Sequence, residues 1–140
     1  MSRVLGLDIG TVRIGVALSD LERLVATPLT TIPGRDEQAA VRAIVALLEE
    51  HDVGAIVAGL PLDLDGGSGR AAKRTERFLE RLAQRTPLAI HYVDERMTSV
   101  QAERTLLDAD LSRARRKEVI DRVAASLILQ TWLDAHPATR

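Results

Sequence analysis

Carboxylates in unusually apolar surroundings are the residues of this chain most suited to chemistry. Asp8 lies inside the apolar segment 4–9, and Asp94 and Glu95 directly follow another apolar segment. Asp121 begins a run of small and apolar residues. An ionised carboxylate in apolar surroundings is costly unless a cation or several hydrogen bonds compensate it. Gathered together, such oxygen ligands could hold one or two divalent cations, and Mg²⁺ binds in this way together with substrate phosphates. Paired ions stabilise the attacking and leaving oxygens of a phosphoryl displacement.

Each acid also has an ordinary structural interpretation. Asp8 could cap the turn at Gly10 by accepting hydrogen bonds from the backbone. Asp121 could mark the polar border of a helix face, because Ala125 and Ile128 follow it by four and seven positions and share that face. The three histidines of the chain form no convincing Ser-His-Asp set, so nucleophilic catalysis by a serine is not predicted.

Hydrophobic periodicity predicts the elements that would position these acids. A strand precedes the turn at Gly10-Thr11, and the elements expected after it are strands at about 12–18 and 23–32, a helix at 36–50, a strand at 53–59, a helix at 70–85, a strand at 88–93, and helices at 98–109 and 113–136. Pro28 lacks a donor for the sheet ladder, which predicts an edge strand or a bulge.

This order predicts one α/β domain over residues 1–140. Three consecutive strands with short connections should form an antiparallel meander, and the two βα-connected strands should pair in parallel. The expected fold is thus a mixed five-stranded sheet with helices on both faces. Asp36 and Thr98 are expected to cap the helices that follow them. In the last helix, Val119, Val123, Leu127 and Trp132 are expected to face inward.

Composition narrows the function classes. The 140 residues include no cysteine, which excludes disulfides and thiolate metal sites. There is no apolar run long enough for a spanning helix and no leader typical of secretion, so a cytoplasmic protein without membrane contact is expected. The formal net charge is −1 and only three residues are aromatic. Attraction to a polyanion must therefore come from local basic patches rather than from the whole molecule or from base stacking.

Two basic clusters could supply such patches. Arg70, Lys73, Arg74 and Arg77 share one face of a predicted helix at spacings of three and four. Arg113, Arg115, Arg116 and Lys117 open the last helix. Both could position a nucleic acid through its phosphates without reading its sequence. The first set could equally be a solvated helix face, because acidic residues interleave with it, and the glycine-rich loop 66–69 before it could be a mobile lid or a plain surface loop.

Four motifs, in this order, make the chain similar to the YqgF/RuvX family of RNase H-like nucleases, which includes pre-16S rRNA nucleases and Holliday junction resolvases. They are Leu5-Gly6-Leu7-Asp8-Ile9-Gly10 with Arg13-Ile14-Gly15 and Ser19-Asp20; Gly59-Leu60-Pro61 with Asp65-Gly66 and Gly69; Asp94-Glu95-Arg96-Met97-Thr98; and Lys117 with Asp121-Arg122-Val123-Ala124-Ala125. Nearly the whole chain is covered. Ser99 stands where a second threonine is expected.

The resemblance implies an RNase H-like fold and a nuclease that uses Mg²⁺ or Mn²⁺. Asp8, Glu95 and Asp121 would be the catalytic metal ligands, and water would attack the phosphorus. Neighbouring strand residues point to opposite faces, so only one of Asp94 and Glu95 can face the metal, and Glu95 is preferred. The residues expected to contact nucleic acid are Arg13, Arg70, Arg74, Arg96, Arg113, Arg115, Arg116 and Lys117. Arg13 and Arg96 could instead pair with the acids.

Several functions remain open at this point. The leading one is 5′-end processing of pre-16S rRNA, that is, cleavage of structured RNA during ribosome biogenesis. The alternative is resolution of four-way DNA junctions, which needs a homodimer with two symmetric sites, and nothing in the sequence predicts that interface. A nucleotide-binding ATPase-like module, suggested by Asp8-Ile9-Gly10-Thr11, would need a second domain that 140 residues do not provide. A non-catalytic nucleic-acid-binding scaffold is the last candidate.

Overall fold

The computed structural model describes residues 2–62, 65–98 and 113–137, and of residues 113–122 the backbone only. The elements are β1 (Arg3–Ile9), β2 (Arg13–Ser19), β3 (Ala26–Pro33), α1 (Glu37–Glu50), β4 (Val53–Leu60), α2 (Arg70–Ala83), β5 (Ile90–Asp94), the short 3₁₀ helix η1 (Glu95–Met97) and α4 (Arg113–Ala135). The predicted helix at 98–109 lies outside the described residues. No helix in the described part of the chain has the length and apolar character needed to cross a membrane.

The five strands form one mixed sheet in the order β3-β2-β1-β4-β5. The pairs β1–β2 and β2–β3 are antiparallel, whereas β1–β4 and β4–β5 are parallel. This confirms the meander followed by two βα-connected strands. Pro28 pairs with Ala17 at a shift of register on the edge strand β3, so both features expected from the missing donor are present.

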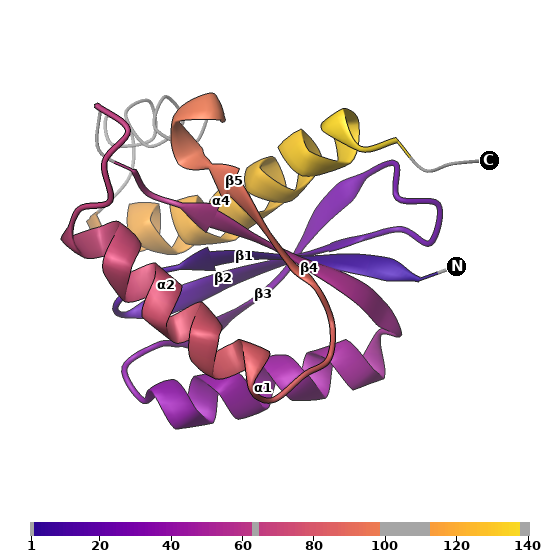
Figure 1. The fold of residues 1–140 in the computed structure, drawn as a ribbon, viewed down its shortest axis with the longest axis horizontal. Coiled ribbons are helices and arrows are strands. Elements are labelled where there is room, and N and C mark those ends of the chain that lie inside the picture. Colours follow the sequence, from indigo (N-terminus) through magenta and orange to yellow (C-terminus); the bar gives the residue numbers. More distant parts are fainter. Residues whose placement is uncertain (1, 63–64, 99–112, 138–140) are drawn as a thin grey trace.

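Helices cover both faces of the sheet, with α4 on one face and α1 and α2 on the other (Figure 1). Successive side chains of β1 point to opposite faces of the sheet and therefore contribute to both hydrophobic cores. Val4 belongs to the core under α4, whereas Leu5 and Leu7 belong to the core under α1 and α2. The residue after Leu7, which is Asp8, therefore falls on the α4 face.

Helix α4 packs very closely on the middle of the sheet because β1 presents a glycine there. A Cβ added at Gly6 would lie 2.7 Å from Leu129 Cβ and 3.1 Å from the carbonyl oxygen of Ala125. Ala125, Ile128 and Leu129 are completely buried in this layer. The inward position expected for Trp132 is confirmed, since it is 8% exposed.

The inward positions expected for the rest of α4 fit less well. Val123 and Leu127 are only half-buried, although Leu127 packs against the edge of the core. The side chain of Val119 lies outside the described residues. The buried face of α4 is thus rotated toward Ala124, Ala125 and Ile128, because small residues allow the closest approach to the glycine of β1.

The structure confirms the helix cap expected at α1 and shows an additional turn after β5. The Asp36 side chain accepts a hydrogen bond from Ala39 N at 3.2 Å, as expected for an N-cap. Thr98 closes η1, because its hydroxyl donates to the carbonyl oxygen of Glu95 at 2.8 Å, and the helix that Thr98 was expected to cap lies outside the described residues. The sequence did not predict η1, which turns the chain sharply at the end of β5.

Candidate active site

The residues singled out for chemistry gather at one end of the sheet. The carboxyl ends of β1 and β4, the turn η1 and the beginning of α4 all lie at this end, on the left in Figure 1. In open sheets, parallel strands commonly place ligand-binding groups at their carboxyl ends. Asp8 is the next-to-last residue of β1, and Glu95 is the first residue of η1.

Asp8 is a buried carboxylate, 5% exposed, with a glycine on either side of it in the sheet. Across the antiparallel pair it faces Gly15 of β2. On the other side Leu7 pairs with Ala58 of β4, so the next residue of that strand, Gly59, lies beside Asp8. Neither neighbour carries a side chain, so neither strand crowds the Asp8 carboxylate on the α4 face.

The Glu95 side chain occupies the room that Gly59 leaves. A Cβ added at Gly59 would lie 2.9 Å from Glu95 Oε1 and 3.1 Å from Glu95 Cγ. The same Cβ would lie 2.5 Å from Ile128 Cδ1 of α4. The Glu95 carboxylate therefore extends over β4 on the α4 face, toward the strand that carries Asp8.

The Asp94 carboxylate is hydrogen-bonded to Arg96. Its Oδ2 accepts a hydrogen bond from Arg96 Nη2 at 2.6 Å, and its Oδ1 accepts from Arg96 Nε at 3.0 Å and from the Arg96 backbone N at 2.9 Å. The side-chain hydrogen bond from Arg96 is the main cause that lowers the pKa of Asp94. The pairing in turn raises the pKa of Arg96. Asp94 thus caps η1 and anchors Arg96, which favours Glu95 over Asp94 as a ligand.

Arg96 also adjoins the glycine-rich loop. A Cβ at Gly66 would lie 3.6 Å from Arg96 Nη1, and Gly66 has a φ of +88°, a conformation that favours glycine. The loop is tightened by a hydrogen bond from Gly67 N to Asp65 Oδ1 at 2.9 Å. The loop and the Asp94–Arg96 pair therefore flank the site on the side of β5.

The donor set suits a hard divalent cation. Mg²⁺ is bound through one or two carboxylates and substrate phosphates, and Asp8 and Glu95 offer two carboxylates on one face. The predicted third ligand, Asp121, belongs to α4 and precedes Ala125 by one helical turn, but its side chain lies outside the described residues. Within the described side chains, no three acidic or histidine groups form a metal cluster.

The predicted phosphate-contacting residues are distributed unevenly. Arg13 begins β2, and side-chain alternation places it on the same face as Gly15 and Asp8. Arg70 is exposed at the start of α2, and Arg74 lines a cavity beside Gly10 and Thr11. The side chains of the remaining four, Arg113, Arg115, Arg116 and Lys117, lie outside the described part of the chain.

Comparison with known proteins identifies the family. The model of the family described as "RuvX: Holliday junction resolvase" matches residues 2–135. The chain belongs to the RuvX family. A RuvX relative from Myxococcus xanthus (strain DK1622), named "Putative pre-16S rRNA nuclease", is 48% identical over 134 residues, which cover 96% of this chain and 89% of the relative. A relative with the same name from Thermoanaerobacter pseudethanolicus is 44% identical, with 95% of this chain and 96% of the relative covered.

Solved structures confirm the RNase H-like fold expected for a RuvX protein. The structure titled "T. thermophilus RuvC in complex with Holliday junction substrate" matches with a TM-score of 0.60 at 10% identity, covering 96% of this chain and 95% of that one. The Fowlpox virus Holliday junction resolvase matches with a TM-score of 0.57 at 9% identity, covering 95% and 99%. At such identities the likeness concerns the fold alone.

Sequence reasoning missed one of the two glycines beside Asp8. Gly15 was interpreted, with Gly6 and Gly10, as room for a phosphate strand close to the sheet, but Gly59 was given no role. The signal that could have found it is register: once β1 lies between β2 and β4, the residues beside Asp8 follow from counting along each strand. Arg35, Arg81 and Arg85, which line cavities on the opposite face, had also not been singled out.

Proposed function

We propose that this RuvX protein is a divalent-metal-dependent nuclease that processes the 5′ end of pre-16S rRNA. The observation that carries the proposal is the buried Asp8 carboxylate between Gly15 and Gly59, with Glu95 extending over Gly59 on the same face. The names of the relatives supply the substrate.

In this proposal Asp8, Glu95 and Asp121 hold Mg²⁺ or Mn²⁺ through their carboxylate oxygens. When bound, the ions supply positive charge that stabilises the attacking and leaving oxygens of phosphodiester hydrolysis. The attacking group is water, so no side chain needs to act as nucleophile. Burial of Asp8 keeps competing water away, and Gly15 leaves room for the backbone of the substrate beside the carboxylate.

The basic residues position the substrate in this proposal. Arg13 lies on the face of Asp8 by strand alternation, and Arg74 lies beside the turn that follows Asp8. Arg96 is held by Asp94 next to the glycine-rich loop. Phosphate contacts fix the register of a nucleic acid without selecting its sequence, which suits an enzyme that recognises a structured precursor. The four basic residues at the start of α4 would extend these contacts.

The decisive experiment compares the wild type with Asp8→Asn on precursor 16S rRNA, a four-way DNA junction, and single- and double-stranded controls, with Mg²⁺ or Mn²⁺. We expect the wild type to cleave the rRNA precursor and Asp8→Asn to lose at least about 100-fold in rate, because one of few ligands loses its charge. Binding of Mn²⁺, followed by calorimetry, should weaken in parallel.

Asp20→Asn is the matched control for this experiment. Asp20 accepts hydrogen bonds from the backbone of Leu24 and Val25 at the other end of β2, and asparagine can still accept them. It should cleave and bind Mn²⁺ as the wild type does. Failure of the wild type to cut any of the substrates would overturn the proposal.

A second candidate is resolution of four-way DNA junctions, favoured by the description of the matching family. Two symmetric cuts require two copies of the site in a homodimer. Paired incisions in the junction by a stable dimer, without cleavage of the rRNA precursor, would establish this function in place of the first.

A further inference from the structure

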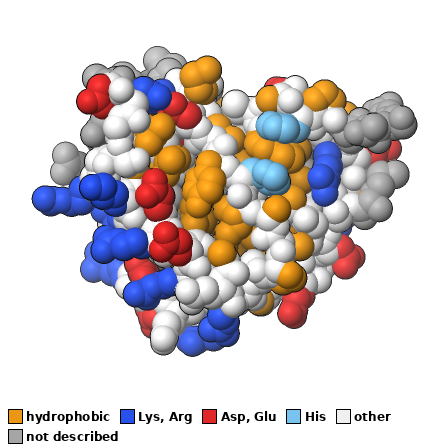
Figure 2. Space-filling view, viewed as in Figure 1, with side chains coloured by type: hydrophobic (Ala, Val, Ile, Leu, Met, Phe, Trp, Pro, Cys, Tyr) orange, Lys and Arg blue, Asp and Glu red, His pale blue; other side chains and the backbone are white. Residues whose placement is uncertain are grey.

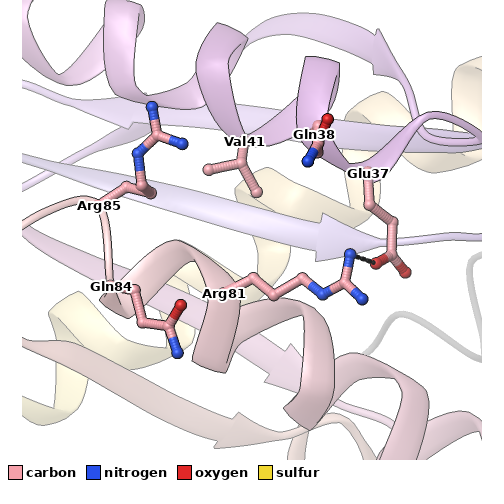
Figure 3. A pocket seen from close by; sticks show the side chains of 6 residues that line it. All are labelled: Glu37, Gln38, Val41, Arg81, Gln84 and Arg85. Carbon is pink, nitrogen blue, oxygen red and sulfur yellow. Dashed lines mark ion pairs between the residues drawn. The ribbon is translucent and has the colours of Figure 1, made fainter.

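Two adjoining cavities lie between α1 and α2, on the face of the sheet opposite α4. One has a volume of about 330 Å³ and is lined by Glu37, Gln38, Val41, Arg81, Gln84 and Arg85 (Figure 3). The other has a volume of about 250 Å³, and its lining includes Gly10, Thr11, Arg35, Glu37 and Arg74. Because Glu37 lines both, the cavities adjoin, and together they are called the α1–α2 groove.

The α1–α2 groove is strongly basic in a chain that is not. Its lining contains four arginines and one glutamate, a formal charge of +3, whereas the formal net charge of the chain is −1. Basic side chains gather over the part of the molecule formed by α2 and α1 (Figure 2). Such a local concentration of positive charge attracts polyanions even when the whole protein is slightly acidic.

The basic and acidic side chains of α2 lie on different sides of the helix. Arg74 and Arg81, seven positions apart, line the groove. Glu76 and Glu80 act on Tyr92 of β5 instead, where they help burial to raise the pKa of the tyrosine. In Figure 2, acidic side chains accordingly lie between the basic group and the hydrophobic band along the middle of the molecule. The acids of α2 therefore do not cancel the charge of the groove.

The lining offers the contacts that one nucleic-acid strand needs. The arginines can form paired hydrogen bonds with phosphate oxygens. Gln38 and Gln84, which also line the larger cavity, carry amides that both donate and accept hydrogen bonds and so suit sugars or base edges. Volumes of a few hundred Å³ are those of sites for small ligands, so each cavity matches about one nucleotide rather than a duplex.

In the absence of a ligand, an ion pair within the groove keeps Arg81 in place. Arg81 Nη1 forms an ion pair with Glu37 Oε2 at 2.9 Å, and the two side chains are 61% and 38% exposed. Ion pairs between exposed side chains contribute little stability. A phosphate can therefore replace the Glu37 carboxylate at Arg81 at small cost.

The groove begins next to the candidate active site. Ile9 and Gly10, the two residues after Asp8, line the smaller cavity together with Arg74. From there the groove continues along α1 and α2 to Arg85. A strand bound near Asp8 would reach the groove by passing over the carboxyl end of β1.

We propose that the α1–α2 groove binds the phosphodiester backbone of a single strand that flanks the point of cleavage. The inference rests on the proposed nuclease function and adds to it where the flanking strand lies. Arg35 and Arg74 bind the part nearest the cleavage point, and Arg81 and Arg85 bind the part farther away.

The test measures binding of fluorescent single-stranded RNA and DNA of matched sequence, without divalent metal so that no cleavage occurs. For the double variant Arg81→Gln/Arg85→Gln we expect about tenfold weaker binding at low salt, because two charge-assisted contacts are lost. The slope of log affinity against log salt should fall in size by about 1.4, since each phosphate contact of a single strand contributes about 0.7. Comparing the RNA and DNA arms shows which sugar the groove prefers.

Two further variants separate binding from folding. Glu37→Gln should bind more tightly, because it removes the one negative charge of the groove and releases Arg81, whereas a purely structural ion pair predicts no gain. Arg81→Lys/Arg85→Lys keeps the charge and should retain the salt slope. Arg42→Gln, which removes an exposed arginine of α1 that lines neither cavity, is the matched control and should bind as the wild type does.

Equal binding by the wild type and Arg81→Gln/Arg85→Gln, or a change seen only with duplexes, would overturn the inference. Cleavage assays distinguish this from failure of the proposed function. On substrates with a single-stranded flank the double variant should raise KM and leave kcat unchanged, and on substrates without the flank neither should change. If the wild type cuts nothing while the binding results hold, the nuclease proposal fails and the groove remains a nucleic-acid site.

Discussion

At the scale of single residues, the site depends on positions that carry no side chain. Gly59→Ala would place a methyl group 2.5 Å from Ile128 Cδ1 and 2.9 Å from Glu95 Oε1. We expect a loss of about 1–3 kcal/mol in the free energy of unfolding from overpacking, together with a large loss of cleavage because Glu95 is displaced. Urea unfolding and cleavage assays measure the two effects.

Gly6→Ala is the matched control for this prediction. It also crowds α4, with a Cβ 2.7 Å from Leu129 Cβ, but the atoms nearest to that Cβ belong to Leu129 and Ala125 and not to Glu95. Its stability should fall similarly while cleavage per folded molecule falls much less. Equal losses of cleavage in the two variants would show that packing of α4, rather than the place of Glu95, limits activity.

The neighbouring acids Asp94 and Glu95 should respond differently to substitution and to pH. Arg96 lowers the pKa of Asp94 below its ordinary value of 3.8. Since the folded pKa is depressed, the stabilisation is present above about pH 4 and is lost as the pH falls through the folded pKa. Asp94→Asn should therefore lower the melting temperature at pH 7, and its difference from the wild type should vanish in strong acid.

Glu95→Gln provides the contrast to Asp94→Asn. It should abolish most cleavage and weaken Mn²⁺ binding, whereas Asp94→Asn should keep Mn²⁺ binding. The opposite pattern would assign the ligand to Asp94. The sequence predicted Glu95 from strand alternation, but it did not predict η1, the turn of three residues that separates Glu95 from β5.

At the scale of elements, the side chain of Gln130 links α4 to the edge of the sheet. Gln130 Oε1 accepts from Ala26 N at 2.8 Å, and Gln130 Nε2 donates to Leu24 O at 3.0 Å. Gln130→Ala should lower the free energy of unfolding by about 1–2 kcal/mol through the loss of these bonds. Urea unfolding measures this.

Thr131→Ala serves as the control for Gln130→Ala. The Thr131 hydroxyl donates only within its own helix, to the carbonyl oxygen of Leu127 at 2.8 Å. Its removal should change stability by no more than about 0.5 kcal/mol. If both variants lose the same amount, the bonds to β3 do not fasten α4.

Most elements could be predicted from the sequence because their patterns are strong. Apolar segments at β1 and β4 predicted strands, and Pro28 predicted the irregular edge. The buried side of α4 was harder to predict because residues 123–129 are almost all apolar or small, so periodicity hardly distinguishes one face from another. Contact with Gly6 and Gly59 of the sheet fixes which side turns inward.

The candidate site could be predicted in part for a similar reason. A carboxylate inside the apolar strand β1 is conspicuous in the sequence, so Asp8 could be singled out as a candidate directly. The glycines beside it become meaningful only through pairing between strands far apart in the chain. The α1–α2 groove depends on two helices lying side by side, which no local pattern in either helix predicts.

At the scale of the whole molecule, one sheet joins both cores, so we expect a single cooperative unfolding transition. Trp132, the only tryptophan, reports on the α4 layer and stacks on His136 with ring centroids 4.3 Å apart. Its fluorescence and the far-UV circular dichroism should change at the same urea concentration. An earlier change in fluorescence would show that α4 separates before the sheet unfolds.

Because α4 packs on Gly6 and Gly59, the site is completed late during synthesis of the chain. β1 leaves the ribosome first and α4 last, and domains fold as units during synthesis. The Glu95 side chain and Ile128 of α4 come together over Gly59 only once α4 has docked. A nascent chain that already displays Asp8 therefore still lacks a finished site, so an enzyme proposed to cut ribosomal RNA would stay inactive beside the ribosome that is producing it.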